Sequence, residues 1–174
     1  MERSNTLRFM STKLEEIYEP IGKLVVRFQF LEMLLNFLLI DLLKQDYDAG
    51  FCITSEMSFS RLVASLVTIS EVRIKDVSLI EEIRKVAGQL KICEEGRNKV
   101  IHSNYGITKD GIMRIKTTAK QRSGLKKSIY DITIQEIVDH IKEIEDANKQ
   151  LREVGHKLHT RGIISSYYFK SPPL

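Results

Sequence analysis

The stretch EEGRNKVIHSNYG, residues 94–106, is where a helical pattern in this chain gives way to a pattern of short strands. Before and within it, apolar residues recur every three or four positions, at Leu79, Ile83, Val86, Leu90, Cys93 and Val100. This spacing predicts an amphipathic helix over residues 78–103, with Ser78 and Glu81 as a capping box and Gly106 beyond its end. The same spacing places Arg97 on the apolar stripe. A guanidinium there keeps its charge and needs a partner, water or an anion.

Apolar spacing also predicts two helices before this one. The first begins near Pro20 and extends to Leu42, and residues 1–16 are expected to form a flexible arm before it. Residues 45–57 contain several polar and turn-forming side chains and are expected to form a loop. Ser58 then opens a second helix with one apolar face.

A small β excursion is expected after residue 104. Alternating side chains predict strands near 105–109 and 112–117, joined by the tight turn Lys109-Asp110-Gly111. A basic loop over residues 118–127 leads to a third strand near 128–132. Thr133 and Glu136 form a second capping box, which starts the last helix, and residues 161–174 form a non-helical tail. The expected fold is mainly α: one domain over residues 1–174, a bundle of four to five helices with a β-hairpin excursion at about 105–132.

The composition fits a soluble globular protein, with 43% hydrophobic and 29% charged residues in a chain of 174. Two cysteines, Cys52 and Cys93, give no disulfide framework, and no export signal or membrane span is recognisable. We therefore expect a cytoplasmic location. The formal net charge is +4. Between residues 99 and 127 the only acid is Asp110, and the bases are Lys99, Lys109, Arg114, Lys116, Lys120, Arg122, Lys126 and Lys127.

One helical turn offers a fixed cation, an amide and an imidazole, at Arg97, Asn98 and His102. Asn98 and His102 are four residues apart and therefore lie on one side of the helix. RNA carries its own nucleophile, the 2′-hydroxyl. Cleavage therefore needs a base, a cation for the charge on the phosphate, and a proton for the leaving oxygen. Imidazole exchanges protons near neutral pH, and arginine can bind two phosphate oxygens at once.

The sequence Arg97-Asn98-x3-His102 near the end of a long helix resembles the Rx4–6H motif of the HEPN superfamily, and the order of elements is similar over residues 17 to 160. The resemblance implies an all-α bundle that forms a homodimer, with the site at the two-fold cleft between two motif helices. It also implies a metal-independent endoribonuclease in which Arg97 and His102 carry the reaction and Asn98 supports them. Many members are toxins or defence effectors. Some are paired with a minimal nucleotidyltransferase antitoxin that modifies a Tyr in a His-x-Tyr extension. In this chain the Tyr, Tyr105, stands one residue further along.

The predicted catalytic residues are therefore Arg97, Asn98 and His102, with Tyr105 as a modification target or a support of the site. The predicted RNA-binding residues are Lys99, Arg114, Lys116, Lys120 and Arg122. We expect no metal and no cofactor, and the expected partners are RNA, a second copy of the chain and an antitoxin, with no membrane. The alternative function is a non-catalytic bundle of the same family that binds nucleotide or a partner protein. Simpler roles also stay open: an ion pair of Arg97 with Glu94, and packing of Tyr105.

Overall fold

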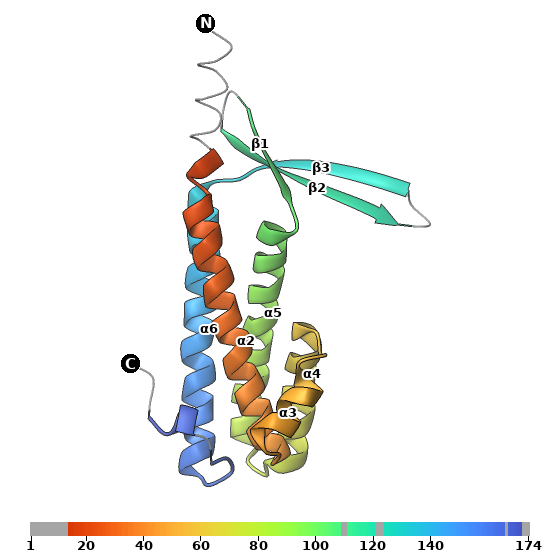
Figure 1. Cartoon of the computed structure of the whole chain (residues 1–174). Coiled ribbons are helices and arrows are strands. Elements are labelled where there is room, and N and C mark those ends of the chain that lie inside the picture. Colours follow the sequence, from red (N-terminus) through yellow and green to blue (C-terminus); the bar gives the residue numbers. More distant parts are fainter. Residues whose placement is uncertain (1–13, 109–110, 121–123, 166, 172–174) are drawn as a thin grey trace, which may run out of the picture. The chain divides into compact units, whose positions relative to one another are not determined.

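The computed structural model describes residues 14–108, 111–120, 124–165 and 167–171. In this part of the chain, five α-helices and one three-stranded antiparallel sheet follow one another, with the sheet between α5 and α6 (Figure 1). The predicted fold class is confirmed. The bounds are α2 Tyr18–Leu43, α3 Tyr47–Thr54, α4 Phe59–Arg73, α5 Val77–Ile101, β1 Asn104–Ile107, β2 Ile112–Lys120, β3 Gly124–Asp131 and α6 Ile134–Thr160.

The chain divides into two compact units, each described here by itself. The sheet unit consists of Met1–Val26 and Gly96–Ile141. The helical unit consists of Arg27–Glu95 and Lys142–Leu174. Because the division cuts α2, α5 and α6, each of these helices contributes residues to both units. The predicted arm lies mostly outside the described residues, since residues 1–13 are not among them.

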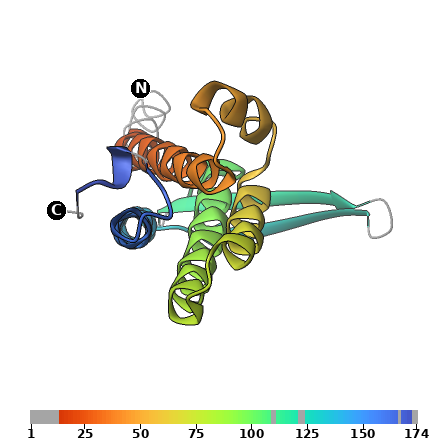
Figure 2. The ribbon, with the colours of Figure 1, turned by 90° about the horizontal axis from the view of Figure 1, so that it is seen from below.

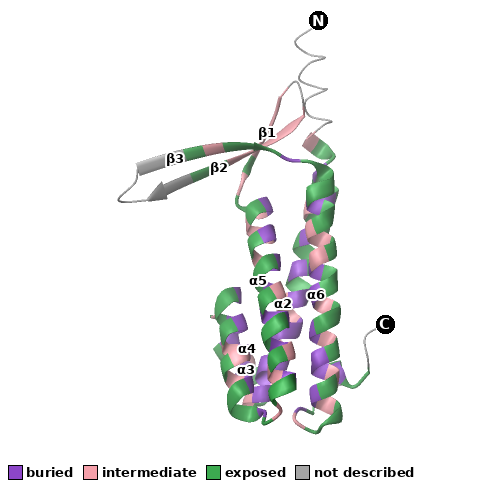
Figure 3. Cartoon of the chain, turned by 180° about the vertical axis from the view of Figure 1, so that it is seen from behind, coloured by how far each residue is buried: buried purple, intermediate pink, exposed green. Residues whose placement is uncertain are grey.

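The buried residues of the helical unit, purple on the ribbon of Figure 3, are mostly aliphatic and form its core. The short helices α3 and α4 lie beside α2 (Figure 2). Both contact it through aromatic rings: the rings of Phe28 and Phe59 lie 4.7 Å apart, and those of Phe37 and Phe51 lie 5.4 Å apart. Aromatic pairs at such distances stabilise a core beyond their buried area. None of the described helices combines the length and apolar character needed to cross a membrane.

The helix α3 replaces the loop predicted over residues 45–57. Asp46 caps it, because its side chain accepts a hydrogen bond from the amide of Ala49. Gly50 allows the helix to approach α2 closely: a Cβ at Gly50 would lie 2.6 Å from a side-chain carbon of Ile40. The sequence reads as a loop because this helix has only eight residues and its start is marked by one aspartate.

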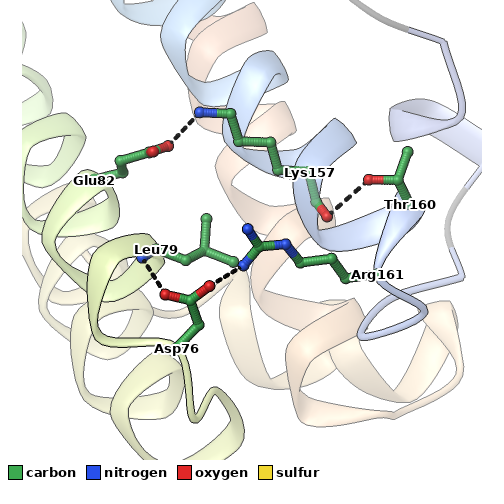
Figure 4. A network of polar contacts seen from close by, with 6 residues as sticks. All are labelled: Asp76, Leu79, Glu82, Lys157, Thr160 and Arg161. Carbon is green, nitrogen blue, oxygen red and sulfur yellow. Dashed lines mark hydrogen bonds and ion pairs between the residues drawn. The ribbon is translucent and has the colours of Figure 1, made fainter.

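The start of α5 also differs from the prediction. Asp76, and not Ser78, caps the helix, since the Asp76 carboxylate accepts from the amide of Leu79 at 3.2 Å. The same carboxylate pairs with Arg161 of α6, and Lys157 Nζ lies 2.6 Å from Glu82 Oε2 (Figure 4). These contacts hold α5 and α6 together at one end of the helical unit. They also lower the pKa of the Asp76 carboxyl, first through the amide hydrogen bond and then through Arg161.

The C-terminal tail packs on its own chain. Residues Tyr167–Phe169 form one 3-10 turn within the segment predicted as non-helical. The ring of Phe169 is 1% exposed and occupies the space beside Gly155, where a Cβ would lie 2.1 Å from the ring. Tyr168 stacks on Phe37 with a centroid distance of 3.9 Å. The last described residues are therefore part of the packing of the helical unit.

The sheet has the order β1-β2-β3. Ile107 pairs with Ile112, and the amide of Thr108 donates to the carbonyl of Gly111, so the first hairpin turns where it was predicted. Lys109 and Asp110 themselves lie outside the described residues. The predicted basic loop over residues 118–127 is wrong, because β2 and β3 continue through most of it, with Lys120 opposite Gly124. The sequence shows no alternation of apolar residues there, and residues 116–120 are held in the strand by their pairing with β3.

The second capping box is confirmed at the start of α6. The amide of Thr133 donates to Glu136 Oε2 at 2.8 Å, and the amide of Glu136 donates to Thr133 Oγ1 at 3.2 Å. These reciprocal bonds satisfy two amides that no helical carbonyl can reach. They fix the point at which the chain leaves β3 and enters α6 in the sheet unit.

Candidate active site and the adjoining pocket

The last turn of α5 belongs to the sheet unit, and its residues differ in burial. Gly96 and Val100 are buried, whereas Arg97 is half-buried and His102 is exposed. Arg97 is therefore at the edge of the predicted stripe, and Gly96 takes part in its burial. At Gly96 the helix α6 approaches closely, since a Cβ there would lie 2.6 Å from His140 Nδ1. Only glycine leaves room for that imidazole.

The three predicted catalytic residues come together. Arg97 NH1 donates to Asn98 Oδ1 at 2.9 Å and lies 3.4 Å from His102 Nε2. Because an arginine has only donors, Nε2 can only accept in this contact. Because Asn98 accepts through its oxygen, its Nδ2 group presents two N–H donors. The guanidinium, amide and imidazole thus form one connected cluster.

Tyr105 forms a hydrogen bond to the end of α5. Its hydroxyl donates to the carbonyl of Val100 at 2.7 Å, which satisfies one of the carbonyls left open at a helix C-terminus. Burial raises the pKa of the Tyr105 phenol, and the positive charge of Arg114 partly opposes this. The hydroxyl is thus bonded to the helix that carries the cluster. This contact supports the packing interpretation of Tyr105 and gives it an indirect role in positioning the last turn.

Arg114 of β2 also binds the end of α5. Its NH1 donates to the carbonyl of Lys99 at 3.0 Å, and its guanidinium carbon lies 5.0 Å from the centre of the Tyr130 ring. A cation at a helix C-terminus and over an aromatic face is favourable on both counts. This arginine was predicted to bind RNA, and the structure shows that it already joins β2 to α5 and β3.

A pocket of about 490 Å³ lies in the sheet unit beside this helix end. It brings together three of the predicted RNA-binding residues, Lys99, Arg114 and Lys116. The side chain of Lys120 and the whole of Arg122 lie outside what the structure describes. Sequence reasoning did not assign Tyr130, Asp139 and His140 to a binding site, although they line the same pocket. Tyr130 could be assigned to this pocket only from its pairing with Arg114 in the sheet, and the sequence alone does not give that pairing.

His156 and His159 belong to the helical unit, near the end of α6. His156 Nδ1 is 3.1 Å from the carbonyl oxygen of Phe169, which ties it to the tail. Within the described residues, no group of three or more His, Cys, Asp or Glu side chains is placed to hold a metal ion. Cys93 is buried, and its thiol donates to the carbonyl of Glu143 at 3.4 Å.

Comparisons of this chain with protein-family models, with curated proteins and with solved structures found no match. The function is therefore inferred from the geometry of the cluster and the pocket.

Proposed function

We propose that this protein is a metal-independent endoribonuclease of the HEPN type that cleaves RNA by attack of the 2′-hydroxyl. The observation that carries the proposal is the cluster at the end of α5. A permanent cation lies 2.9 Å from an amide oxygen and 3.4 Å from an imidazole nitrogen. None of these side chains is fully buried, so a phosphate can reach them.

The distances suit the reaction. The 2′-oxygen attacks the phosphorus of its own neighbouring phosphate, so the base and the phosphate-binding cation must lie a few ångströms apart. Arg97 would bind the phosphate oxygens, and the Asn98 Nδ2 group would donate to one of them. As Arg97 turns from His102 to the phosphate, the lone pair of His102 Nε2 would become free and would take the 2′-hydroxyl proton as the new O–P bond forms. The bond from phosphorus to the 5′-oxygen then breaks, leaving a 2′,3′-cyclic phosphate.

The leaving 5′-oxygen needs a proton, and each chain supplies one His102. In a homodimer with the site at the two-fold cleft, His102 of one subunit would accept the first proton, and the partner subunit's His102 would donate the second. This division of roles is part of the proposal. It predicts that mixed dimers with one His102→Ala subunit lose most of the activity.

The test is cleavage of a labelled RNA by purified protein in excess chelator, with analysis of the product ends. We expect 2′,3′-cyclic phosphates. We expect His102→Ala to reduce the rate roughly 100- to 10,000-fold, the usual contribution of one positioned acid or base. Its melting temperature should stay unchanged, because the side chain is exposed. Arg97→Ala should also inactivate, whereas Arg73→Ala, at an exposed arginine of α4, is the matched control.

Products with 3′-hydroxyl ends, or full activity in Arg97→Ala, would contradict this mechanism. A protein that binds RNA or nucleotide without cutting it would instead be the non-catalytic bundle of the same family. We extend the proposal to a toxin or defence role with an antitoxin of the nucleotidyltransferase type. In that case expression of the parent chain should arrest growth, and expression of His102→Ala should not.

A further inference from the structure

The pocket beside α5 has no part in the proposed bond cleavage. Its volume of about 490 Å³ lies within the range of pockets that bind small ligands, roughly 300–1,000 Å³. Its wall combines two lysines, an arginine and the ring of Tyr130. Positive charge beside an aromatic platform is the composition with which proteins bind single-stranded nucleic acid.

Register decides which residues of the two strands share a face. Arg114 pairs with Tyr130 and Lys116 pairs with Ser128, so the side chains of these two pairs lie on one face. The intervening pairs, Ile115 with Ile129 and Thr117 with Lys127, lie on the other face. The side chains of Arg114, Lys116 and Tyr130 all line the pocket, which therefore opens on the first face. That face is cationic and aromatic, whereas the other carries two isoleucines and one lysine.

The charges on this face are not all neutralised by the residues that the structure describes. Arg114 is bonded to the end of α5 and lies over Tyr130. Lys99 and Lys116 are exposed, and neither ammonium group forms an ion pair with a described residue, although two carboxylates line the same pocket. Two positive charges therefore remain available to an anion at the pocket.

The two carboxylates of the pocket are held by their own helix. Glu136 Oε2 accepts from the Thr133 amide, and Asp139 Oδ1 accepts from Gln135 Nε2 at 2.9 Å. Both lie in the first two turns of α6, where the helix dipole is positive and offsets part of their charge. A phosphate is therefore expected near the lysines, on the side of the pocket formed by β2 and α5.

Tyr130 is suited to stack with a base. Its ring is 46% exposed even though the Arg114 guanidinium lies 5.0 Å from its centre. A base within a duplex is already stacked and paired, so this ring can engage only an unpaired base. The aromatic contact therefore selects for a single strand.

We propose that the pocket binds one nucleotide of a single-stranded RNA, with the base on Tyr130 and the adjacent phosphates near Lys99 and Lys116. The choice of RNA as the polymer rests on the proposed function. Lys99 lies two residues after Arg97, so the two side chains point to different sides of the last turn of α5. The proposal thus names the substrate class as unpaired RNA and assigns the pocket as a subsite for a nucleotide separate from the one at the cleaved bond.

The test is equilibrium binding of a labelled single-stranded oligoribonucleotide to the full chain carrying His102→Ala, measured over a range of salt concentrations. Tyr130→Ala should weaken binding by roughly 5- to 150-fold, the effect of losing one stacked base. Tyr130→Phe should bind like the parent, because the ring is kept. Lys116→Ala should weaken binding. It should also reduce the slope of log affinity against log salt concentration by about 0.7, because one phosphate contact on a single strand is lost.

Lys127→Ala is the matched control, because Lys127 is an exposed lysine of the same two strands on the opposite face. It should leave the affinity nearly unchanged at physiological salt, and the same RNA annealed to its complement should bind more weakly. Equal losses in Lys116→Ala and Lys127→Ala, or equal binding of single and double strands, would overturn the proposal. The two proposals fail separately: RNA that binds through Tyr130 and Lys116 without being cut refutes only the nuclease, and cleavage without these dependences refutes only the subsite.

Discussion

The close approach of α5 and α6 at Gly96 makes a quantitative prediction about two glycines of one helix. Replacing a helical glycine by alanine stabilises a helix by about 1 kcal/mol when the methyl group meets nothing. Gly88 of α5 is such a position, with no atom within 4 Å of a built Cβ. At Gly96, the same Cβ would lie 2.6 Å from His140 Nδ1 and 3.0 Å from His140 Cγ.

The contact at Cγ decides the cost of the substitution at Gly96. Rotation about the Cβ–Cγ bond of His140 leaves Cγ in place and cannot relieve this contact, so the whole imidazole or the helix must move. Overpacking of this kind costs about 1–3 kcal/mol. We therefore expect Gly88→Ala to stabilise by up to about 1 kcal/mol, and Gly96→Ala to range from neutral to about 2 kcal/mol destabilising. The helix propensity term is the same for both, so their difference isolates the contact.

Urea denaturation of the two variants measures this difference, and thermal melting should separate them by roughly 2–12 °C for a chain of this size. In a His140→Ala background the contact is absent, and Gly96→Ala should then stabilise as Gly88→Ala does, which a double-mutant cycle reports. If Gly96→Ala stabilises the parent chain as much as Gly88→Ala, the two helices do not approach each other here. The account of why Gly96 is buried would then be wrong.

Three further predictions concern the helical unit. The pKa of the Asp76 carboxyl is lowered in the folded protein, so the carboxylate stabilises the fold at pH values above its unfolded-state pKa of about 3.9. This stabilisation is lost as the pH falls through the lower folded-state pKa. The stability of Asp76→Asn should accordingly fall less than that of the parent on acidification below about pH 4, as followed by circular dichroism. Burial, aided by a neighbouring carboxylate, raises the pKa of the Cys93 thiol to about 12, whereas Cys52 is exposed. An alkylating reagent at neutral pH should therefore label Cys52 in the native protein and both cysteines only after denaturation, which mass spectrometry measures. Gly155→Ala should displace the ring of Phe169 and destabilise by about 1–3 kcal/mol, and a melting curve unchanged from the parent would count against the packing of the tail.

The features that the sequence predicted well are those determined by near neighbours in the chain. The periodic leucines of α2 and the reciprocal Thr133 and Glu136 cap depend on spacings of three or four residues. The cluster of Arg97, Asn98 and His102 depends on one helical turn, so its members could be named before their contacts were known.

The features that were missed depend on contacts between distant segments. The path of the buried stripe through Gly96 requires His140, which lies on another helix. The pocket requires the register that sets Tyr130 opposite Arg114, and a shift of one residue would move Tyr130 to the other face. A sequence pattern indicates which face of a helix or strand is apolar, but it does not indicate which other element packs on that face.

The pairing of β2 with β3 beyond the end of β1 has a consequence for solubility. β3 is an edge strand in the described sheet, and β1 covers only residues 112–115 of β2. Open strand edges recruit other strands and lead to aggregation unless charges, lysines above all, keep them apart. With Ile129 65% exposed on this hairpin, the exposed Lys116 and Lys127 act as gatekeepers, and Lys116 is also a candidate RNA contact. Neutralising both together should make the protein precipitate through its hairpin, so their roles are best separated by one substitution at a time.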